Sequence, residues 1–235
     1  VGRVDNPPVG GLLTCWSLAA YFPILVMEFK HHYRRRLPHF QHDNATYFVT
    51  SRLHGSLPKS VLERLAEIHE QSVRLIHRKA NSPEEGQFLM DEENRRHFRR
   101  MDRVLHQVEE GPHHFRNSVI AQLFFDAALY RHKTVYELIC LTVMSNHTHM
   151  VFTPLHDGMP LHWVMGRLKR YVGQQANAAL GLKGPFWQDE NWDRIVRNDE
   201  ELSRIIGYVL NNPVEADLVN DWQQWPYSWL NPDYL

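Results

Sequence analysis

Two apolar runs joined by a short polar turn constrain this chain most, because together they predict a β-hairpin inside the core. Residues 135–143 are mostly apolar, as expected of a strand that is covered on both faces. The pair Ser145-Asn146 favours a tight turn, and the strand-like run 147–152 follows it. We therefore expect these two strands to lie side by side in an antiparallel sheet.

The second strand carries two histidines, His147 and His149, with Thr148 between them. Successive side chains of a strand point to opposite faces, so both imidazoles lie on one face, with Cβ atoms roughly 7 Å apart. One metal ion can bridge that span, and neutral imidazole is a common ligand of divalent metals. Taken alone, such a pair is more often structural than metal-binding.

The other patterns predict one more early strand and a series of helices. Residues 45–50 are rich in β-branched and aromatic residues, and Pro58 opens a helix after them. Helical spacing of apolar residues recurs at 82–110, 120–127 and 161–180. Asn198 and Glu201 form a capping box before a last helix, which we expect to end at Asn211-Asn212-Pro213.

This order predicts an α+β fold: an antiparallel sheet with helices packed on one face, on the ferredoxin-like, split βαβ plan. A helical insertion at about 59–117 and a C-terminal helical extension are added to that plan. We expect residues 28–235 to form a single domain. Residues 1–27 contain an apolar run that Pro23 interrupts, and we interpret them as an over-extended, non-native leader rather than a signal peptide or a membrane span.

Composition excludes several classes of protein. Hydrophobic residues make up 43% of the 235 residues, enough for a core and unlike a disordered chain. The formal net charge of −1 argues against a protein that coats DNA without regard to sequence, although a local basic patch would suffice for a specific reader. Cys15 and Cys140 form no CxxC pair, which suits a reducing cytoplasm and disfavours a zinc knuckle.

The helix at 161–180 carries two polar residues that could join the histidines. At 100° per residue, its apolar stripe contains Leu168 and Val172, with Gln175 at the edge and Tyr171 on the flank. A glutamine on a buried face costs free energy unless a partner satisfies it, and a metal ion on the sheet could do so. Two histidines, a polar third ligand and a tyrosine therefore suggest a metal-assisted tyrosine nucleophile.

Four segments together carry a resemblance to a known family. The chain resembles the REP-associated tyrosine transposases, which belong to the His-hydrophobic-His superfamily of single-strand DNA transposases and include insertion-sequence transposases. The resemblance spans about residues 34–230 and departs from the family pattern at Thr148, where the family has a bulky apolar residue. The matching segments are the His-Thr-His hairpin, Arg167-Leu168-Lys169-Arg170-Tyr171, Gly184-Pro185-Phe186-Trp187-Gln188 and Tyr208-Val209-Leu210-Asn211-Asn212-Pro213-Val214-Glu215-Ala216. The early segment Ala45-Thr46-Tyr47-Phe48-Val49-Thr50-Ser51-Arg52-Leu53 also resembles the family's first strand.

The resemblance implies a DNA transposase and strand-specific endonuclease that cleaves and rejoins single-stranded or hairpin DNA. It implies that His147, His149 and Gln175 hold a divalent cation, Mg²⁺ or Mn²⁺. It further implies that Tyr171 attacks the scissile phosphate, leaving a 5′-phosphotyrosine and a free 3′-hydroxyl. The implied DNA target is a REP-like palindromic hairpin with a single-stranded tag.

Further expectations concern DNA contacts and setting. Basic side chains would contact phosphates and aromatic rings would stack on unpaired bases. We expect a cytoplasmic, nucleoid-associated protein with no membrane segment, acting as a monomer or homodimer. The candidate phosphate-contact residues are Arg34, Arg35, Arg36, Arg167, Lys169 and Arg170, and the candidate stacking residues are Trp187 and Tyr33.

Two other classes of function stay open. One is a domesticated, catalytically weak hairpin-DNA-binding protein on the same fold, which the substitution at Thr148 suggests. The other is an unrelated metal-dependent hydrolase that uses the histidines with a carboxylate such as Asp126 or Glu137. A hydrolase would need no tyrosine nucleophile, whereas a transposase of this kind would lose its covalent intermediate without one.

Overall fold

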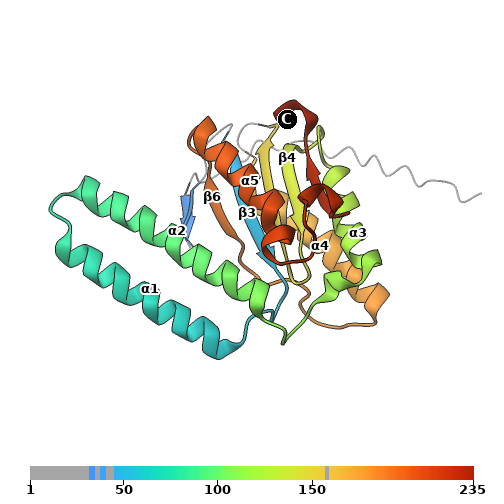
Figure 1. The fold of residues 1–235 in the computed structure, drawn as a ribbon, viewed down its shortest axis with the longest axis horizontal. Coiled ribbons are helices and arrows are strands. Elements are labelled where there is room, and N and C mark those ends of the chain that lie inside the picture. Colours follow the sequence, from blue (N-terminus) through green and yellow to red (C-terminus); the bar gives the residue numbers. More distant parts are fainter. Residues whose placement is uncertain (1–31, 35–37, 41–44, 157–158) are drawn as a thin grey trace, which may run out of the picture.

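The computed structural model describes residues 32–34, 38–40, 45–156 and 159–235, and only the backbone of the first two segments. A five-stranded antiparallel sheet lies at its centre, in the order β6-β3-β5-β4-β7 (Figure 1). Its strands are β3 (Tyr47–Arg52), β4 (Tyr136–Val143), β5 (His147–Pro154), β6 (Trp192–Ile195) and β7 (Ser228–Leu230). A separate two-stranded sheet pairs β1 (His32–Arg34) with β2 (Pro38–Phe40).

The predicted hairpin is the middle of this sheet. Strand β5 lies third of the five and pairs with β4 on one side and β3 on the other. The turn closes with a hydrogen bond from the Met144 amide to the His147 carbonyl, at 2.9 Å. All but one of the β5 side chains are buried. A strand covered on both faces explains why both of the runs that flank the turn are apolar.

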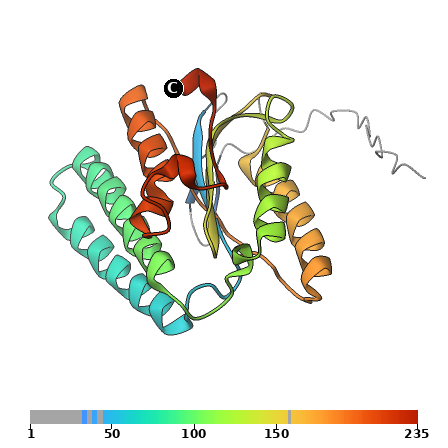
Figure 2. The ribbon, with the colours of Figure 1, turned by 45° about the vertical axis from the view of Figure 1, so that its right-hand side comes forward.

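Helices cover both faces of the sheet, which lies between two layers of helices in Figure 2. On one face, α3 (Ser118–Leu129) and α4 (Leu161–Leu180) pack on a core that includes Met150 and Phe152. On the other, α5 (Asp199–Glu215) and the end of α2 (Pro83–Gln107) pack on a core that includes Phe48 and Val151. The alternation of β5 therefore sends His147 and His149 toward α2 and α5, and Thr148 toward α3 and α4.

A long helical hairpin, α1 (Lys59–Lys79) followed by α2, extends away from the sheet (Figure 1). Ser82 caps α2 by accepting a hydrogen bond from the Glu85 amide, and Pro83 occupies its first turn. The C-terminal half of α2 reaches the sheet, where Phe98, Asp102 and Leu105 are buried. The hairpin thereby brings polar residues of an inserted segment to the strand that carries the histidines.

The predicted α+β class and antiparallel sheet are confirmed. The helices lie on both faces, so the prediction of one covered face is wrong: the inserted hairpin and the C-terminal helix cover the second. The last helix continues past Asn212 to Glu215 with Pro213 inside it, so its predicted end is wrong by a few residues, and Pro213 donates no backbone hydrogen bond to the preceding turn. Residues 1–27 lie outside the described residues. Within the described residues, no helix is long and apolar enough to span a membrane.

Candidate metal and nucleophile site

Four side chains that could hold a metal ion meet where α2 crosses β5. Asp102, His106, His147 and His149 each offer one ligand atom, and these atoms lie within 4.8 Å of one another. Asp102 and His106 are one turn apart on α2, and His147 and His149 share one face of β5. Two side chains of β5 and two of α2 thus lie close together, although the two elements are about 40 residues apart in the chain.

His149 is held on both of its ring nitrogens. Its Nδ1 lies 2.8 Å from the hydroxyl of Thr50, its cross-strand neighbour on β3. Its Nε2 lies 3.0 Å from Oδ1 of Asn212 and 3.4 Å from Oδ1 of Asp102. The ring stacks on Phe48 with centroids 5.8 Å apart. These contacts fix the ring orientation, as partners of the second ring nitrogen do in metal sites.

His147 is held on one side and open on the other. Its Nδ1 lies 2.6 Å from Oδ1 of Asn146, and its ring stacks on His106 with centroids 5.4 Å apart. Its Nε2 lies 3.8 Å from Oδ1 of Asp102 and has no hydrogen-bond partner among the described residues. The side chain is 1% exposed, so this nitrogen is buried without a partner and points at a carboxylate.

Helix α5 supplies a tyrosine and an asparagine to the same cluster. Tyr208 and Asn212 are one turn apart, and the ring of Tyr208 lies 5.6 Å from that of His149, centroid to centroid. Oδ1 of Asn212 lies 2.8 Å from Nε2 of His106 and 3.0 Å from Nε2 of His149, and its amide donates to the Tyr208 carbonyl. Asn212 is fully buried, so these bonds determine where its oxygen points.

Asp102 links the two histidines of β5 to the tyrosine. Its Oδ2 accepts a hydrogen bond from the hydroxyl of Tyr208. Its Oδ1 faces the two histidines of β5 and, within the part of the chain that the structure describes, accepts no hydrogen bond. A carboxylate 3% exposed with one free oxygen is costly unless a positive charge lies beside it.

Burial sets the charges of this cluster. Burial, together with the neighbouring His106, lowers the pKa of His149 to about 3. Burial and the neighbouring His149 likewise lower the pKa of His147 well below its usual value. Burial and the Asp102 carboxylate raise the pKa of Tyr208 above its usual value. Both imidazoles are therefore neutral at pH 7, which is the form that binds metals.

Tyr171 and Gln175 lie elsewhere. Both are on α4, which packs on the opposite face of the sheet from the histidines. Tyr171 is 45% exposed with the guanidinium of Arg131 5.5 Å from its ring centre, and Gln175 is exposed. The structure therefore does not bring these two residues to His147 and His149. In their place it brings Tyr208 and Asn212, which have the same i, i+4 spacing.

The predicted DNA contacts divide into four groups. Trp187 is 7% exposed and packs among Phe115, Phe124 and Phe186, so its rings cannot stack on bases, and that prediction is wrong. The ammonium of Lys169 already donates to the carbonyls of Gln188 and Asp189 and to the side chain of Asn191.

Arg167 and Arg170 are exposed, and their phosphate contacts stay predictions. Arg35 and Arg36 lie outside the described residues, as do the side chains of Tyr33 and Arg34.

The carboxylates considered for a hydrolase do not join the cluster. Asp126 is exposed on α3, on the other face of the sheet, and accepts a hydrogen bond from Gln122. Glu137 is cross-strand from Thr153, at the end of the sheet opposite His147. The carboxylate at the histidines is Asp102.

Arg52 is a candidate phosphate contact that the sequence patterns did not single out. It pairs with His147 across β3 and β5, so the two side chains share a face of the sheet. It is partly buried, makes a 3.4 Å hydrogen bond to Ser56, and forms no ion pair within the described residues. Burial lowers its pKa from the usual value, but an arginine stays protonated at neutral pH.

Thr148 offers a direct test of packing beneath the hairpin. It is 1% exposed and faces α3 and α4, and its hydroxyl has no partner among the described groups. Replacement by the isosteric valine removes this unsatisfied hydroxyl, so we expect Thr148→Val to raise the free energy of unfolding by about 1 kcal/mol in urea. Thr142→Val is the matched control: it loses a 2.9 Å bond to Ser228 and should not stabilise. A less stable Thr148→Val protein would contradict the assignment.

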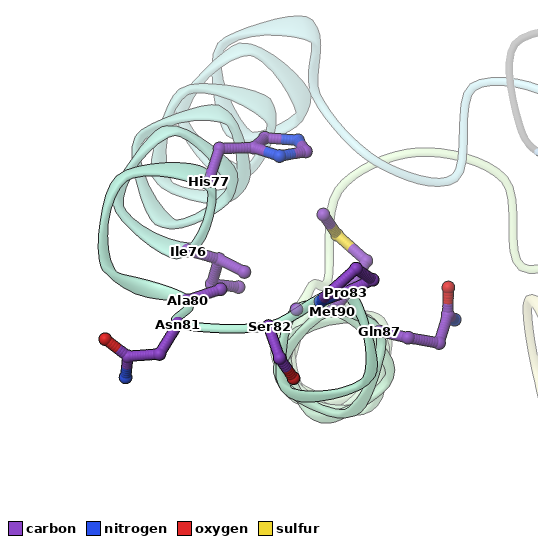
Figure 3. A pocket seen from close by; sticks show the side chains of 9 residues that line it. Ile76, His77, Ala80, Asn81, Ser82, Pro83, Gln87 and Met90 are labelled. Carbon is purple, nitrogen blue, oxygen red and sulfur yellow. The ribbon is translucent and has the colours of Figure 1, made fainter.

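A surface pocket lies at the far tip of the hairpin, where α1 ends and α2 begins (Figure 3). Its lining includes Ile76, Pro83 and Met90, with His77 as its one ionisable residue. The pocket is separated from the cluster by most of the length of α2. It therefore takes no part in the chemistry of the cluster.

Asp102 and Asn212 were not among the predicted site residues, although the sequence contains a feature that indicates each of them. Asp102 interrupts the apolar stripe of α2 between Phe98 and Leu105, at i+4 from one and i−3 from the other. A carboxylate on a buried helix face needs a partner, as was argued for Gln175. Asn212, inside the last helical turn before a proline, carries the same signal.

Comparisons with known proteins include a relative and a solved structure that carry the same family description. No protein-family model matches the chain. A 107-residue stretch is 22% identical to a protein of Haemophilus influenzae named as a REP-associated tyrosine transposase. The match covers 42% of this chain and 61% of the relative, so it spans less than two thirds of the relative's length.

A solved structure described as a REP-associated tyrosine transposase bound to a REP hairpin aligns with 83% of this chain and 80% of its own. The TM-score is 0.41 and the identity 17%. The Haemophilus influenzae relative confirms the resemblance seen in the sequence motifs: part of this chain is similar to a REP-associated tyrosine transposase.

Proposed function

We propose that this protein is a metal-dependent tyrosine transposase that cleaves and rejoins single-stranded or hairpin DNA, with Tyr208 as its nucleophile. One observation carries the proposal: the hydroxyl of Tyr208 is hydrogen-bonded to Asp102 in the same cluster as His147 and His149. A nucleophile, a proton acceptor and ligands for a divalent ion within one cluster are the groups that phosphoryl transfer to tyrosine requires.

The proposed step is an in-line displacement at one phosphodiester. The oxygen of Tyr208 forms a bond to phosphorus, and the bond from phosphorus to the 3′ oxygen breaks. The hydroxyl proton passes to Asp102, and the departing 3′ oxygen takes up a proton from water. The products are a 5′-phosphotyrosine and a free 3′-hydroxyl, and the reverse attack by a 3′-hydroxyl rejoins the strand without ATP.

Asp102 matters because the tyrosine is otherwise a weak nucleophile. Burial and the carboxylate raise the pKa of Tyr208, so at neutral pH it is protonated and must lose its proton during attack. A carboxylate that already accepts its hydrogen bond can take that proton over a short path. Among the described residues Tyr171 forms no hydrogen bond to a carboxylate and has the Arg131 guanidinium over its ring, which favours Tyr208 in this role.

The residues present fit a divalent ion. Two neutral buried imidazoles, a carboxylate oxygen without a partner and the Asn212 oxygen meet in one place. A bound Mg²⁺ or Mn²⁺ would polarise the scissile phosphate and stabilise the charge that develops on its oxygens. His147 and His149 would hold that ion, with Asn212 in the position expected of Gln175.

DNA is proposed to approach from the end of β3 where Arg52 lies. Arg52 is beside His147 and is partly exposed, whereas the histidines are 1% exposed or less. A guanidinium without a carboxylate partner can donate two parallel hydrogen bonds to a phosphate. Exposed Arg167 and Arg170, on α4, are proposed to contact phosphates farther along the strand. The proposed target is a REP-like hairpin, the kind of DNA named for the solved structure.

The test is a covalent adduct assay. A hairpin oligonucleotide with a single-stranded tail and a 3′ label is incubated with the protein and Mn²⁺, then separated under denaturing conditions. We expect labelled DNA to migrate with the protein only when metal is present. Cleaved DNA without an adduct would favour a metal-dependent hydrolase, and hairpin binding without cleavage would favour the domesticated binder. Neither binding nor cleavage would overturn both DNA functions.

A further inference from the structure

We propose that Asp102 and His106, from the inserted helical hairpin, are ligands of the same metal ion as His147 and His149, so that the ion joins the hairpin to the sheet. The family resemblance concerns the strand histidines and not this hairpin. The inference shares the histidines with the proposed function and rests on it only there.

Two unpartnered atoms point into the site. Asp102 Oδ1 and His147 Nε2 are buried, and neither has a hydrogen-bond partner among the described residues. Each lies beside the other possible ligands: Asp102 Oδ1 is 3.8 Å from His147 Nε2 and 3.4 Å from His149 Nε2. Native proteins satisfy nearly all buried polar atoms, and one cation between these atoms satisfies both at once.

The separations suit a single ion. A ligand atom lies about 2.0–2.2 Å from a first-row divalent metal, so two ligands of one ion are at most about 4.4 Å apart. The four ligand atoms lie within 4.8 Å of one another, so the widest pair must approach by a few tenths of an ångström.

The donor set also selects the metal. Three imidazoles and one carboxylate are borderline ligands that suit Mn²⁺, Co²⁺ or Zn²⁺. Mg²⁺ prefers oxygen ligands and retains water in an octahedral shell. We therefore expect this chain to bind Mn²⁺ or Co²⁺ more tightly than Mg²⁺.

The ion would stabilise the docked position of the hairpin. Two ligands come from α2 and two from β5, so binding favours the arrangement in which the helix contacts the sheet. Metal should then slow amide exchange at 98–107, the docked half of α2, more than at 59–79 in α1. A site formed by the strand histidines alone would leave exchange in α2 unchanged.

The experiment measures Mn²⁺ binding by the full chain without DNA. Asp102→Asn and His106→Gln are each expected to weaken Mn²⁺ binding by at least about 10-fold in calorimetry, since even outer partners of ligands have effects of that size. His77→Gln removes an exposed histidine of the same hairpin outside the cluster, and should leave the affinity unchanged. Circular dichroism and thermal melts check that each variant is folded.

A spectroscopic count of nitrogens keeps the inference falsifiable if Asp102→Asn unfolds. Electron spin echo modulation of bound Mn²⁺ should report three imidazole nitrogens in the wild type and two in His106→Gln. Two nitrogens in both proteins, with equal affinities, would overturn the inference and leave the proposed function intact. Three nitrogens, with no loss of cleavage in Tyr208→Phe, would retain the metal centre and refute the proposed nucleophile.

Discussion

Tyr208→Phe should lower the rate of DNA strand cleavage by at least about 1000-fold, because it removes the oxygen proposed to form the bond to phosphorus. The ring stays, so the contacts with Phe48 and His149 are kept. The measurement is single-turnover cleavage of a labelled hairpin oligonucleotide with saturating Mn²⁺. A hairpin-binding assay in parallel shows whether DNA affinity is retained.

The matched control is Tyr171→Phe. Tyr171 is half exposed on α4 across the sheet from the histidines, so losing its hydroxyl should change the cleavage rate by no more than about twofold. A Tyr171→Phe protein without activity, together with an active Tyr208→Phe protein, would reverse the assignment. It would mean that α4 reaches the histidines of another copy of the chain.

The metal-free protein should lose stability as the pH falls below about 6.5. In the unfolded chain histidine titrates near 6.5, whereas the pKa of buried His149 is lowered to about 3 and that of His147 is also lowered. Between these values the unfolded chain binds more protons than the folded protein, so the free energy of unfolding rises with pH. The stabilisation is complete above the unfolded pKa and is lost progressively below it.

The expected change in the free energy of unfolding between pH 7.5 and pH 5 is large for a single domain. A histidine that stays neutral when folded and titrates near 6.5 when unfolded costs about 2 kcal/mol at pH 5, so the two strand histidines together cost about 4 kcal/mol. Urea unfolding at pH 7.5 and pH 5 in the presence of a chelator measures it. His149→Gln should flatten the dependence. A wild-type unfolding free energy independent of pH would contradict the neutral, buried state of these rings.

Local patterns were sufficient to predict much of the fold. The β4–β5 hairpin follows from two apolar runs and a turn pair, and period-2 alternation places His147 and His149 on one face. The predicted N-cap of α5 also formed: the Glu201 amide donates to the Asn198 side chain, and the Glu201 carboxylate accepts from the amide of Arg197, one residue before the cap. Each of these features depends on residues close together in sequence, which is why they could be predicted.

Which helix faces the histidines could not be predicted from periodicity. The stripe of α4 correctly identified the buried side, with Leu168 and Val172 fully buried. A helical stripe, however, states only which side of a helix is apolar and not which face of a sheet it covers. Chain connections decide that, and they place α4 against Met150 and α5 against Val151. Tyr171 and Tyr208 have the same local spacing and differ only in this long-range placement.

The contribution of the α1–α2 hairpin to the site also depends on long-range placement, so local patterns did not predict it. Asp102 and His106 belong to a charged helical insertion, and its many acidic residues predict a solvent-exposed helix face. Their burial arises from the contact of α2 with the sheet, between segments about 45 residues apart in the chain. The one local feature of the sequence that indicates this contact is a carboxylate, Asp102, within the apolar stripe of α2.

The most direct test of the account identifies the residue that carries the DNA. The covalent adduct is digested with protease and nuclease, and the peptide bearing a residual 5′-nucleotide is sequenced by mass spectrometry. We predict the modification on Tyr208, in the peptide that also contains Asn212. Modification of Tyr171, or DNA cleavage that leaves no modified tyrosine, would contradict it.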